Sequence, residues 1–231
     1  MRIDQSVVIG CGGTGQHLLP HLIRLLTYHP EGSTDITAYD GDEFEEHNRE
    51  RQIGYSGTKA SVMDQLLIAQ GLPAVCKAQY MSKDRLKAIL RRGQGTVLVL
   101  AAVDNDATRK MCIDTLVASD RNFLFVTPGN SDAQDADKAI KGNVLWFGRV
   151  DGQDIGVNPA LLFPNIENPQ DAIPRKGSCI EHAPSAPQLI SANALAGAYT
   201  LAVVQNLLDD QMPLQASHMF FNGRSFSTTA N

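Results

Sequence analysis

A glycine-rich turn at residues 10–15, with the sequence GCGGTG, constrains the fold of this chain more than any other feature. The apolar residues 6–10 predict a short buried strand before the turn, and apolar side chains at helical spacing predict a helix over residues 12–28 after it. Glycines let the backbone turn sharply and approach a ligand closely, while the following helix directs its N-terminus at negative charge. This order predicts the first unit of a nucleotide-binding α/β fold.

Strands and helices alternate along the first half of the chain. We expect strands over residues 36–39, 74–79, 96–103 and 123–127, and helices over residues 58–70, 83–92 and 106–118. The unbroken apolar run at 96–103 is typical of a strand in the middle of a parallel sheet. The alternation predicts right-handed βαβ units and therefore a Rossmann-like, doubly wound, mainly parallel α/β sheet. Pro20 falls inside the first helix, where it favours a kink or an early turn.

The pattern changes after residue 129. We expect a strand over residues 143–150, a long crossover loop over 151–187, a strongly periodic helix over 188–208, and a terminal hairpin of residues 218–222 and 225–229. These elements predict a mixed or antiparallel C-terminal extension of the sheet. The chain is therefore expected to form one domain over residues 1–231, with a nucleotide-binding half at 1–129 and a second half at 130–231.

Composition excludes several classes of partner. The net charge is −5 and the basic residues are scattered, which argues against nucleic acid because phosphate backbones are bound through clustered Lys and Arg. No apolar stretch approaches the roughly 20 residues that cross a bilayer, and no signal segment precedes the first strand, so we expect a cytoplasmic protein without membrane contact. The four cysteines form no CxxC pair, which predicts free thiols and no structural zinc.

The second expected strand ends at a carboxylate, Asp40. A carboxylate at this position can accept hydrogen bonds from ribose hydroxyls. Together with the glycine turn alone, Asp40 fits a dinucleotide-dependent oxidoreductase as well as an ATP enzyme.

The segment after Asp40 favours the ATP enzyme. Asn48, Arg51 and Gln52 lie on one stretch, and Lys59 opens the next helix. Arg offers a bidentate fork and Lys a point charge for phosphate oxygens, on which charge grows when an α-phosphate is attacked. For each residue taken singly, a solvated surface position is the alternative.

Asp104 follows the central strand at the edge where open α/β sheets bind ligands. A carboxylate there can hold Mg²⁺, which prefers oxygen ligands. The neighbouring Asn105 either belongs to the site or caps the helix that begins after it.

In these residues the chain resembles the ThiF/MoeB/HesA family, the bacterial relatives of ubiquitin-activating enzymes. The family pattern is a GxGGxG turn, DxD, an Asn, RQ, a Lys, and DN after the central strand. The chain matches it in order and with similar spacing over roughly its first half, at Gly10, Gly12, Gly13, Gly15, Asp40, Asp42, Asn48, Arg51, Gln52, Lys59, Asp104 and Asn105.

The resemblance implies ATP-dependent adenylation of a carboxylate, with release of pyrophosphate. The usual substrate in the family is the C-terminal glycine of a small ubiquitin-like or sulfur-carrier-like protein, and the usual assembly is a homodimer. By this resemblance the glycines would cradle phosphates and Asp40 would bind ribose. Asn48, Arg51 and Lys59 would contact phosphates, and Asp104 would hold Mg²⁺.

The chain departs from the family pattern in three respects. The zinc-binding CxxC pairs are absent from the sequence. The first strand is expected within a few residues of Met1, so we expect no N-terminal helix carrying the arginine that reaches the partner subunit's site in relatives. Arg2 and Arg24 are the candidate substitutes. No rhodanese-like or ubiquitin-fold region is expected either.

The second half is similar to small ThiF-like proteins of bacterial plasmid and phage operons, through the segments 177–179, 187–188 and 192–193. Cys179 lies in the loop where activating enzymes place their acceptor thiol, and a thiolate there would attack an acyl-adenylate to form a thioester. An incidental thiol is the alternative for Cys179. We expect Cys11 and Cys112 to be small apolar residues packed near helices.

Two other classes of function remain open from the sequence. A nicotinamide-dependent oxidoreductase would bind NAD(H) and ignore ATP, although no hydride-transfer constellation is recognisable. A non-catalytic nucleotide-binding scaffold would bind ATP without turnover, and the missing N-terminal arginine favours that alternative.

Overall fold

The computed structural model describes residues 1–54, 56–130, 140–174, 189–211, 217–225 and 227–230. Cys179, the candidate acceptor thiol, lies outside these residues. In chain order the strands are β1 (Gln5–Ile9), β2 (Ile36–Tyr39), β3 (Val75–Lys77), β4 (Val97–Ala101), β5 (Phe123–Asn130), β6 (Lys141–Val150), β7 (Gln153–Gly156), β8 (His218–Asn222) and β9 (Ser227–Ala230). The helices are α1 (Gly13–Tyr28), the 3₁₀ helix η1 (Glu46–Glu50), α2 (Lys59–Ala69), α3 (Lys83–Arg92), α4 (Asp106–Val117), α5 (Pro159–Leu162), α6 (Pro164–Glu167) and α7 (Ile190–Leu208).

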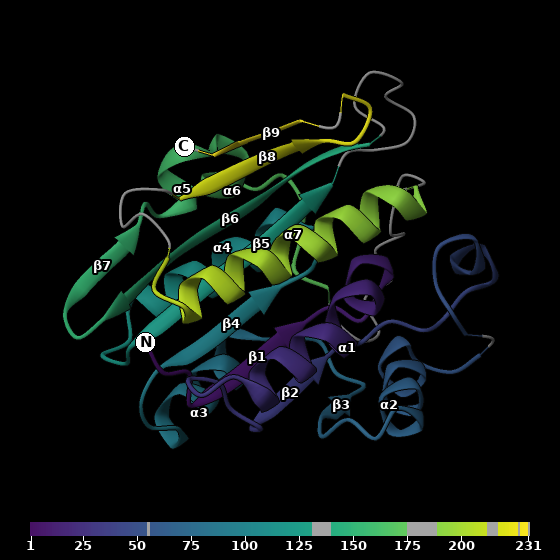
Figure 1. Ribbon diagram of the computed structural model, residues 1–231, viewed down its shortest axis with the longest axis horizontal. Helices are drawn as coiled ribbons and strands as arrows, with labels where there is room; N and C mark the ends of the chain where they lie inside the picture. The colour runs from purple at the N-terminus through teal and green to yellow at the C-terminus, as the bar shows by residue number, and fades with distance from the viewer. Residues whose placement is uncertain (55, 131–139, 175–188, 212–216, 226, 231) are drawn as a thin grey trace.

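In the described part of the chain, nine strands form one sheet in the order β3-β2-β1-β4-β5-β6-β8-β9, with β7 also paired to β6 (Figure 1). The strands from β3 to β5 are parallel, and every pairing from β5–β6 onward is antiparallel. The predicted doubly wound sheet with an antiparallel extension is confirmed. The apolar run at 96–103 contains β4, whose five residues are all buried between β1 and β5.

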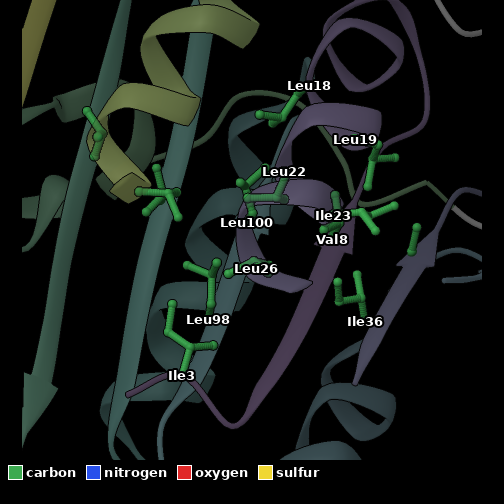
Figure 2. Close-up of a cluster of buried hydrophobic side chains, with 14 of the residues drawn as sticks. Ile3, Val8, Leu18, Leu19, Leu22, Ile23, Leu26, Ile36, Leu98 and Leu100 are labelled. Atoms are coloured by element: carbon green, nitrogen blue, oxygen red, sulfur yellow. The ribbon is translucent and has the colours of Figure 1, made fainter. Parts of the chain in front are cut away.

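Two helical layers cover the sheet. In Figure 1, α1 and α7 lie in front of the sheet and α4 lies behind it. Figure 2 shows the apolar side chains of α1 packing on β1, β2 and β4, with Leu22 and Ile23 fully buried among them. A second core cluster on the other face is formed by residues of the sheet, α3, α4 and α6. The two clusters fix the sheet between rigid layers, so that the ends of its strands have defined positions.

The parallel register aligns the carboxyl ends of three strands. Ile9 of β1 lies opposite Tyr39 of β2 and Ala101 of β4. The chain leaves these strands through the glycine turn, Asp40 and Ala102, so residues distant in sequence meet at one edge. This is the edge at which open α/β sheets bind ligands.

The segment 151–187, expected as a continuous crossover loop, instead contains β7, α5 and α6 in its described part. Asp151 and Gly152 both have positive φ, of 52° and 77°, which is the conformation of a two-residue hairpin turn that returns β7 onto β6. Pro159 and Pro164 each open a short helix, a position where the missing N–H has no cost. The loop expectation was wrong because abundant Pro, Gly and Asn also mark hairpin turns and helix starts.

Pro20 lies inside α1 and not in an early turn, since the helix runs unbroken from Gly13 to Tyr28 around it. The segment 41–57 is polar and charged, yet it buries Phe44, Asn48 and Gln52. These three side chains anchor an otherwise exposed segment to the body of the protein.

Candidate active site

A cleft of about 400 Å³ lies at the carboxyl edge of the parallel strands. Ten of the residues singled out from the sequence line it, namely Gly10, Gly12, Gly13, Asp40, Asp42, Arg51, Gln52, Lys59, Asp104 and Asn105. Gly15 and Asn48 lie outside the lining, and Cys179 is outside the described residues. The cleft also receives residues from the second half of the chain, including Asn130, Asn143 and Phe163.

The glycine turn is held against the neighbouring strands by close backbone contacts. Gly10 has a φ of +103°, and a Cβ placed on it would lie 2.3 Å from the carbonyl oxygen of Ala102. A Cβ on Gly15 would lie 2.4 Å from the carbonyl oxygen of Gly10. Gly12 differs, because among the described residues a Cβ there would meet only the Gln52 amide, at 3.7 Å. Gly10 and Gly15 are thus required by packing, whereas Gly12 keeps the cleft wall open.

The helices α1 and α4 both begin at the cleft, and their N-termini differ. Asn105 caps α4 by accepting a hydrogen bond from the Thr108 backbone N–H at 2.9 Å. Both carboxylate oxygens of Asp171 accept from the next free amides of α4, those of Asp106 and Ala107, at 2.7 Å. The N-cap of α1 is Gly12, which has no side chain to offer, and the first turn of α1 contains no acidic residue. As far as the described residues go, the positive end of the α1 dipole is therefore open to an anion, whereas that of α4 is already neutralised.

Asp40 is buried, and its carboxylate accepts hydrogen bonds from two backbone N–H groups. The amide of Cys11 donates to one oxygen at 2.7 Å and the amide of Asp42 to the other at 2.9 Å. Burial, reinforced by the nearby carboxylate of Asp42, raises the pKa of Asp40 to about 6. Lys59 and the two amides act in the opposite direction but do not offset the burial.

The raised pKa of Asp40 predicts a pH dependence of folding. Between about pH 4 and pH 6 the folded state binds a proton at Asp40 that the unfolded state releases, so stability should fall as pH rises through this window. The whole effect is about 3 kcal/mol at roughly 1.4 kcal/mol per pKa unit. Urea unfolding across this window should show a shallower decline in the free energy of unfolding for Asp40→Asn than for the wild type. Parallel curves would contradict the prediction.

Asp42 and Lys59 meet because the intervening segment closes on itself. Glu43 and Thr58 form an isolated antiparallel bridge, and the Lys59 backbone N–H donates to the Asp42 carbonyl at 2.9 Å. The Lys59 ammonium then lies 2.8 Å from the Asp42 carboxylate, with 16% of the lysine side chain exposed. Burial opposes the lysine charge, but Asp42 and Asp40 outweigh it and raise the pKa of Lys59. A half-buried, charged ammonium is thereby placed in the cleft wall.

Gln16 of α1 docks the segment that carries Arg51 and Gln52. Its side-chain amide donates to the Ile53 carbonyl at 2.9 Å and accepts from the Ile53 N–H at 2.6 Å. This double hydrogen bond brings Gln52 beside the glycine turn. Gln52 is 6% exposed, and its Oε1 atom has no hydrogen-bond partner among the described residues. A buried polar atom left unsatisfied in a cleft wall is costly unless a ligand or water completes it.

Arg51 and Asp104 both line the cleft. Burial lowers the pKa of Arg51, and the negative charge of Asp104 opposes that shift. The guanidinium remains charged at neutral pH because its ordinary pKa is above about 12. Asn48 is buried and does not line the cleft. Its Oδ1 atom accepts a hydrogen bond from the Glu45 N–H at 3.0 Å, which closes a capping box at the start of η1.

Tyr80 is a cleft residue that sequence reasoning missed. Its hydroxyl donates to Asp42 at 2.7 Å, and its ring packs so closely on Gly41 that a Cβ there would lie 2.5 Å from the ring. Burial and this hydrogen bond raise the pKa of Tyr80, so the hydroxyl stays protonated. Tyr80 lies just past the end of the third expected strand, and the shared carboxyl edge was the signal that could have found it.

Arg109 is a second missed residue. Its guanidinium forms an ion pair with Asp106 at 2.6 Å and donates to the Thr127 hydroxyl at 3.1 Å and the Pro128 carbonyl at 3.2 Å. The Val103 carbonyl accepts a further hydrogen bond. Arg109 therefore joins the ends of β4 and β5, and its donors are occupied by the protein itself.

Three further observations on the described residues concern the thiols, groups of metal-binding side chains and membrane-spanning helices. Cys11 and Cys112 are buried, as expected. No group of three or more His, Cys, Asp or Glu side chains suited to a metal ion occurs among the described residues. No helix in the described part of the chain is long and apolar enough to span a membrane.

Comparison with known proteins finds similar structures but no similar sequence. No protein-family model matches the chain, and no curated protein matches it in sequence. Among solved structures, Escherichia coli MccB with AMPCPP and MccA covers 99% of this chain with 15% identity and a TM-score of 0.61. PaaA covers 99% with 13% identity and a TM-score of 0.58. The E. coli tRNA N6-threonylcarbamoyladenosine dehydratase TcdA covers 90% with 15% identity and a TM-score of 0.54.

The match extends over different shares of these proteins. The chain spans 63% of the length of the MccB and PaaA structures and 87% of that of TcdA. MccB, PaaA and TcdA belong to the ThiF/MoeB family, the family that the motifs of this chain resemble. The chain therefore has the ThiF-type fold that its sequence predicts.

Proposed function

We propose that this protein adenylates a carboxylate with ATP. The observation that carries the proposal is the convergence of an uncapped helix N-terminus with Arg51, Lys59 and Asp104 in one cleft. A nicotinamide cofactor does not require this set of charges, whereas an α-phosphate under attack gains negative charge that such groups stabilise. The solved structure of E. coli MccB with ATP, which shares the fold, supports the same ligand.

The residues of the cleft suit separate parts of the nucleotide. Backbone N–H groups in the first turn of α1, beside Gly12, would donate hydrogen bonds to the phosphates. The Asp40 carboxylate would accept hydrogen bonds from the ribose hydroxyls. Arg51 and Lys59 would contact the phosphates. Gln52, whose buried oxygen has no partner among the described residues, would complete its hydrogen bonds with bound ligand or water. Asn48 would act from behind the wall by holding the start of η1.

The proposed reaction is an in-line displacement. A carboxylate oxygen of the substrate forms a bond to the α-phosphorus of ATP, and the bond from the α-phosphorus to the bridging oxygen of pyrophosphate breaks. The products are an acyl-adenylate and pyrophosphate. The carboxylate is already ionised at neutral pH, so the protein supplies positioning and charge stabilisation rather than a general base.

Asp104 is the residue that would hold Mg²⁺. Its side chain is exposed to the cleft, and a single carboxylate suffices because nucleotide phosphates and waters provide the other ligands of Mg²⁺ in such sites. The ion would supply charge neutralisation for the phosphates. Asn105 is committed to capping α4 and is therefore a structural neighbour of this position.

The carboxylate substrate is proposed to be the C-terminus of a peptide or small protein, of the ubiquitin-like or sulfur-carrier kind. The structure of MccB with MccA supports this class. Transfer to Cys179, a homodimeric assembly and action in the cytoplasm are extensions of the same proposal. Light scattering of the purified protein tests the homodimer directly.

The test begins with calorimetric titration of ATP and NAD⁺ into the purified chain, followed by ATP–pyrophosphate exchange with peptides and small proteins that end in a free carboxylate. ATP binding followed by substrate-dependent exchange supports the proposal. ATP binding without exchange favours a nucleotide-binding scaffold. Binding of NAD⁺ without binding of ATP would favour an oxidoreductase and contradict the proposal.

Asp104→Asn should lower substrate-dependent exchange by roughly a hundredfold or more, because even the outer partners of a metal site contribute about 10–100-fold. The matched control is Asp114→Asn, on the exposed surface of the neighbouring helix α4, where Asp114 pairs only with Lys110 among the described contacts. The control should retain wild-type exchange. Equal exchange rates for the two variants would remove Asp104 from the site.

A further inference from the structure

Helix α7 carries one polar residue that its surroundings do not explain. Asn193 lies within the first turns of α7 and is 0% exposed, among apolar neighbours such as Ala192 and Ala196. An amide in such a position is unfavourable unless its hydrogen-bonding groups are used. The contacts of Asn193 show that one end is used and the other is not.

The Oδ1 atom of Asn193 accepts two hydrogen bonds from different elements. The Thr14 hydroxyl of α1 donates to it at 3.0 Å, and the Asn130 amide at the end of β5 donates to it at 2.7 Å. The Nδ2 atom has no partner among the described residues and packs on Gly13, where a Cβ would lie 2.7 Å away. With the Asn193 side chain in this place, only glycine fits at position 13.

The partners of Asn193 belong to the cleft. Gly13, Thr14 and Asn130 all line it, while Asn193 lies behind them in the core layer. In Figure 1, α1 and α7 run side by side from the edge where β4 and β5 end. The Gln52 side-chain amide also lies near the turn, 3.7 Å from where a Cβ on Gly12 would be. The hydrogen bond from Thr14 ties the first turn of α1 to Asn193.

We infer that Asn193 is a positioning residue for nucleotide binding. It fixes the orientation of the first turn of α1 and the end of β5, so that the uncapped amides of α1 point into the cleft. No cap residue performs this task, because the N-cap is Gly12. An apolar residue at 193 would suit the helix and avoid an unpartnered donor, but it could not accept from Thr14 and Asn130. The inference rests on the proposed binding of ATP by this cleft.

Asn193→Ala should weaken binding of AMPCPP, measured by calorimetry, by about tenfold, which corresponds to the loss of roughly one hydrogen bond's contribution. The matched control is Thr200→Ala on the same helix. Thr200 is equally buried, and its hydroxyl donates only to the Ala196 carbonyl, at 2.6 Å, among the described contacts. This control should lower the melting temperature and leave AMPCPP affinity at the wild-type value.

Asn130→Ala extends the test, because it removes a partner of the same bridge. If Asn193 acts through the bridge, the double variant Asn130→Ala/Asn193→Ala should lose less affinity than the sum of the two single losses. Asn193→Ser provides a second replacement in case the alanine variant does not fold. Its short side chain should also weaken binding.

The possible results separate this inference from the proposed function. Failure of the wild type to bind AMPCPP would overturn both. Wild-type binding together with unchanged affinity in Asn193→Ala and Asn193→Ser would overturn the inference alone. A loss of affinity in Thr200→Ala as large as that in Asn193→Ala would also overturn it, because helix stability would then account for the effect.

Discussion

Lys59→Ala should lower ATP–pyrophosphate exchange by about 10²–10³-fold, the cost typical of removing one group that stabilises transition-state charge. The Lys59 ammonium is held in the cleft wall by Asp42 at 2.8 Å, with little of its side chain in solvent. Partial exclusion of water strengthens its interaction with a phosphate oxygen. The measurement is exchange with whichever carboxylate substrate supports it in the wild type.

The control for Lys59 is Lys110→Ala. Lys110 also forms an ion pair with an aspartate, Asp114 at 2.7 Å, but this pair lies on the outside of α4. The Lys110→Ala variant should catalyse ATP–pyrophosphate exchange at the wild-type rate. Thermal unfolding of both variants separates a catalytic loss from a folding defect. A Lys59→Ala protein that folds and exchanges normally would show that phosphate charge is stabilised elsewhere.

Gly10→Ala should destabilise the fold by about 3–5 kcal/mol, the sum of a strained backbone and an overpacked contact. Gly10 has a φ of +103°, which L-residues rarely adopt, and an added Cβ would lie 2.3 Å from the Ala102 carbonyl oxygen. That oxygen belongs to the backbone just after the central strand, so it cannot turn aside as a side chain could. A loss of this size is a large part of the roughly 5–15 kcal/mol that stabilises a typical protein.

Gly152→Ala is the matched control for Gly10. Gly152 also has positive φ, of +77°, but no atom of the described residues lies within 4 Å of the position that a Cβ would occupy. Its substitution should cost about 1 kcal/mol from backbone strain alone. Urea unfolding of both variants measures the difference, which isolates the contact with Ala102. Equal losses would mean that the strand edge adapts to a methyl group.

The parts of the fold that were predictable depend on local properties. The unbroken apolar run at 96–103 identified the central strand because a strand covered on both faces needs apolar residues throughout. Asn105 was recognised as a candidate cap, and it does cap α4. The turn at Asp151 and Gly152 carried an equally local signal, a dipeptide typical of hairpins, and was overlooked among other loop-forming residues.

The candidate site was predictable to the extent that it follows strand ends. Ten of the twelve binding residues named from the sequence line the cleft. Gly10, Gly12, Gly13, Asp40, Asp42, Asp104 and Asn105 do so because the chain leaves each parallel strand at the same edge. Arg51, Gln52 and Lys59 were found through the family pattern. Asn48 could not be placed this way, since its position depends on the closure of the segment between Asp42 and Lys59. The bridge between Glu43 and Thr58 that closes this segment has no recognisable pattern in the sequence.

Local patterns in the sequence predicted the alternation of strands and helices up to residue 130, the glycine turn and most of the cleft residues, because periodicity and backbone preference act over a few neighbouring residues. Which of these groups remain available to a ligand depends on contacts between elements that are distant in the chain. Asp171 neutralises α4 from 65 residues away, and Asn193 reaches Thr14 across 179 residues. Such contacts form only after the sheet has packed its helices, since hydrogen bonds between distant elements depend on their final separation. The open end of α1 beside the closed end of α4 is a property of the packed protein.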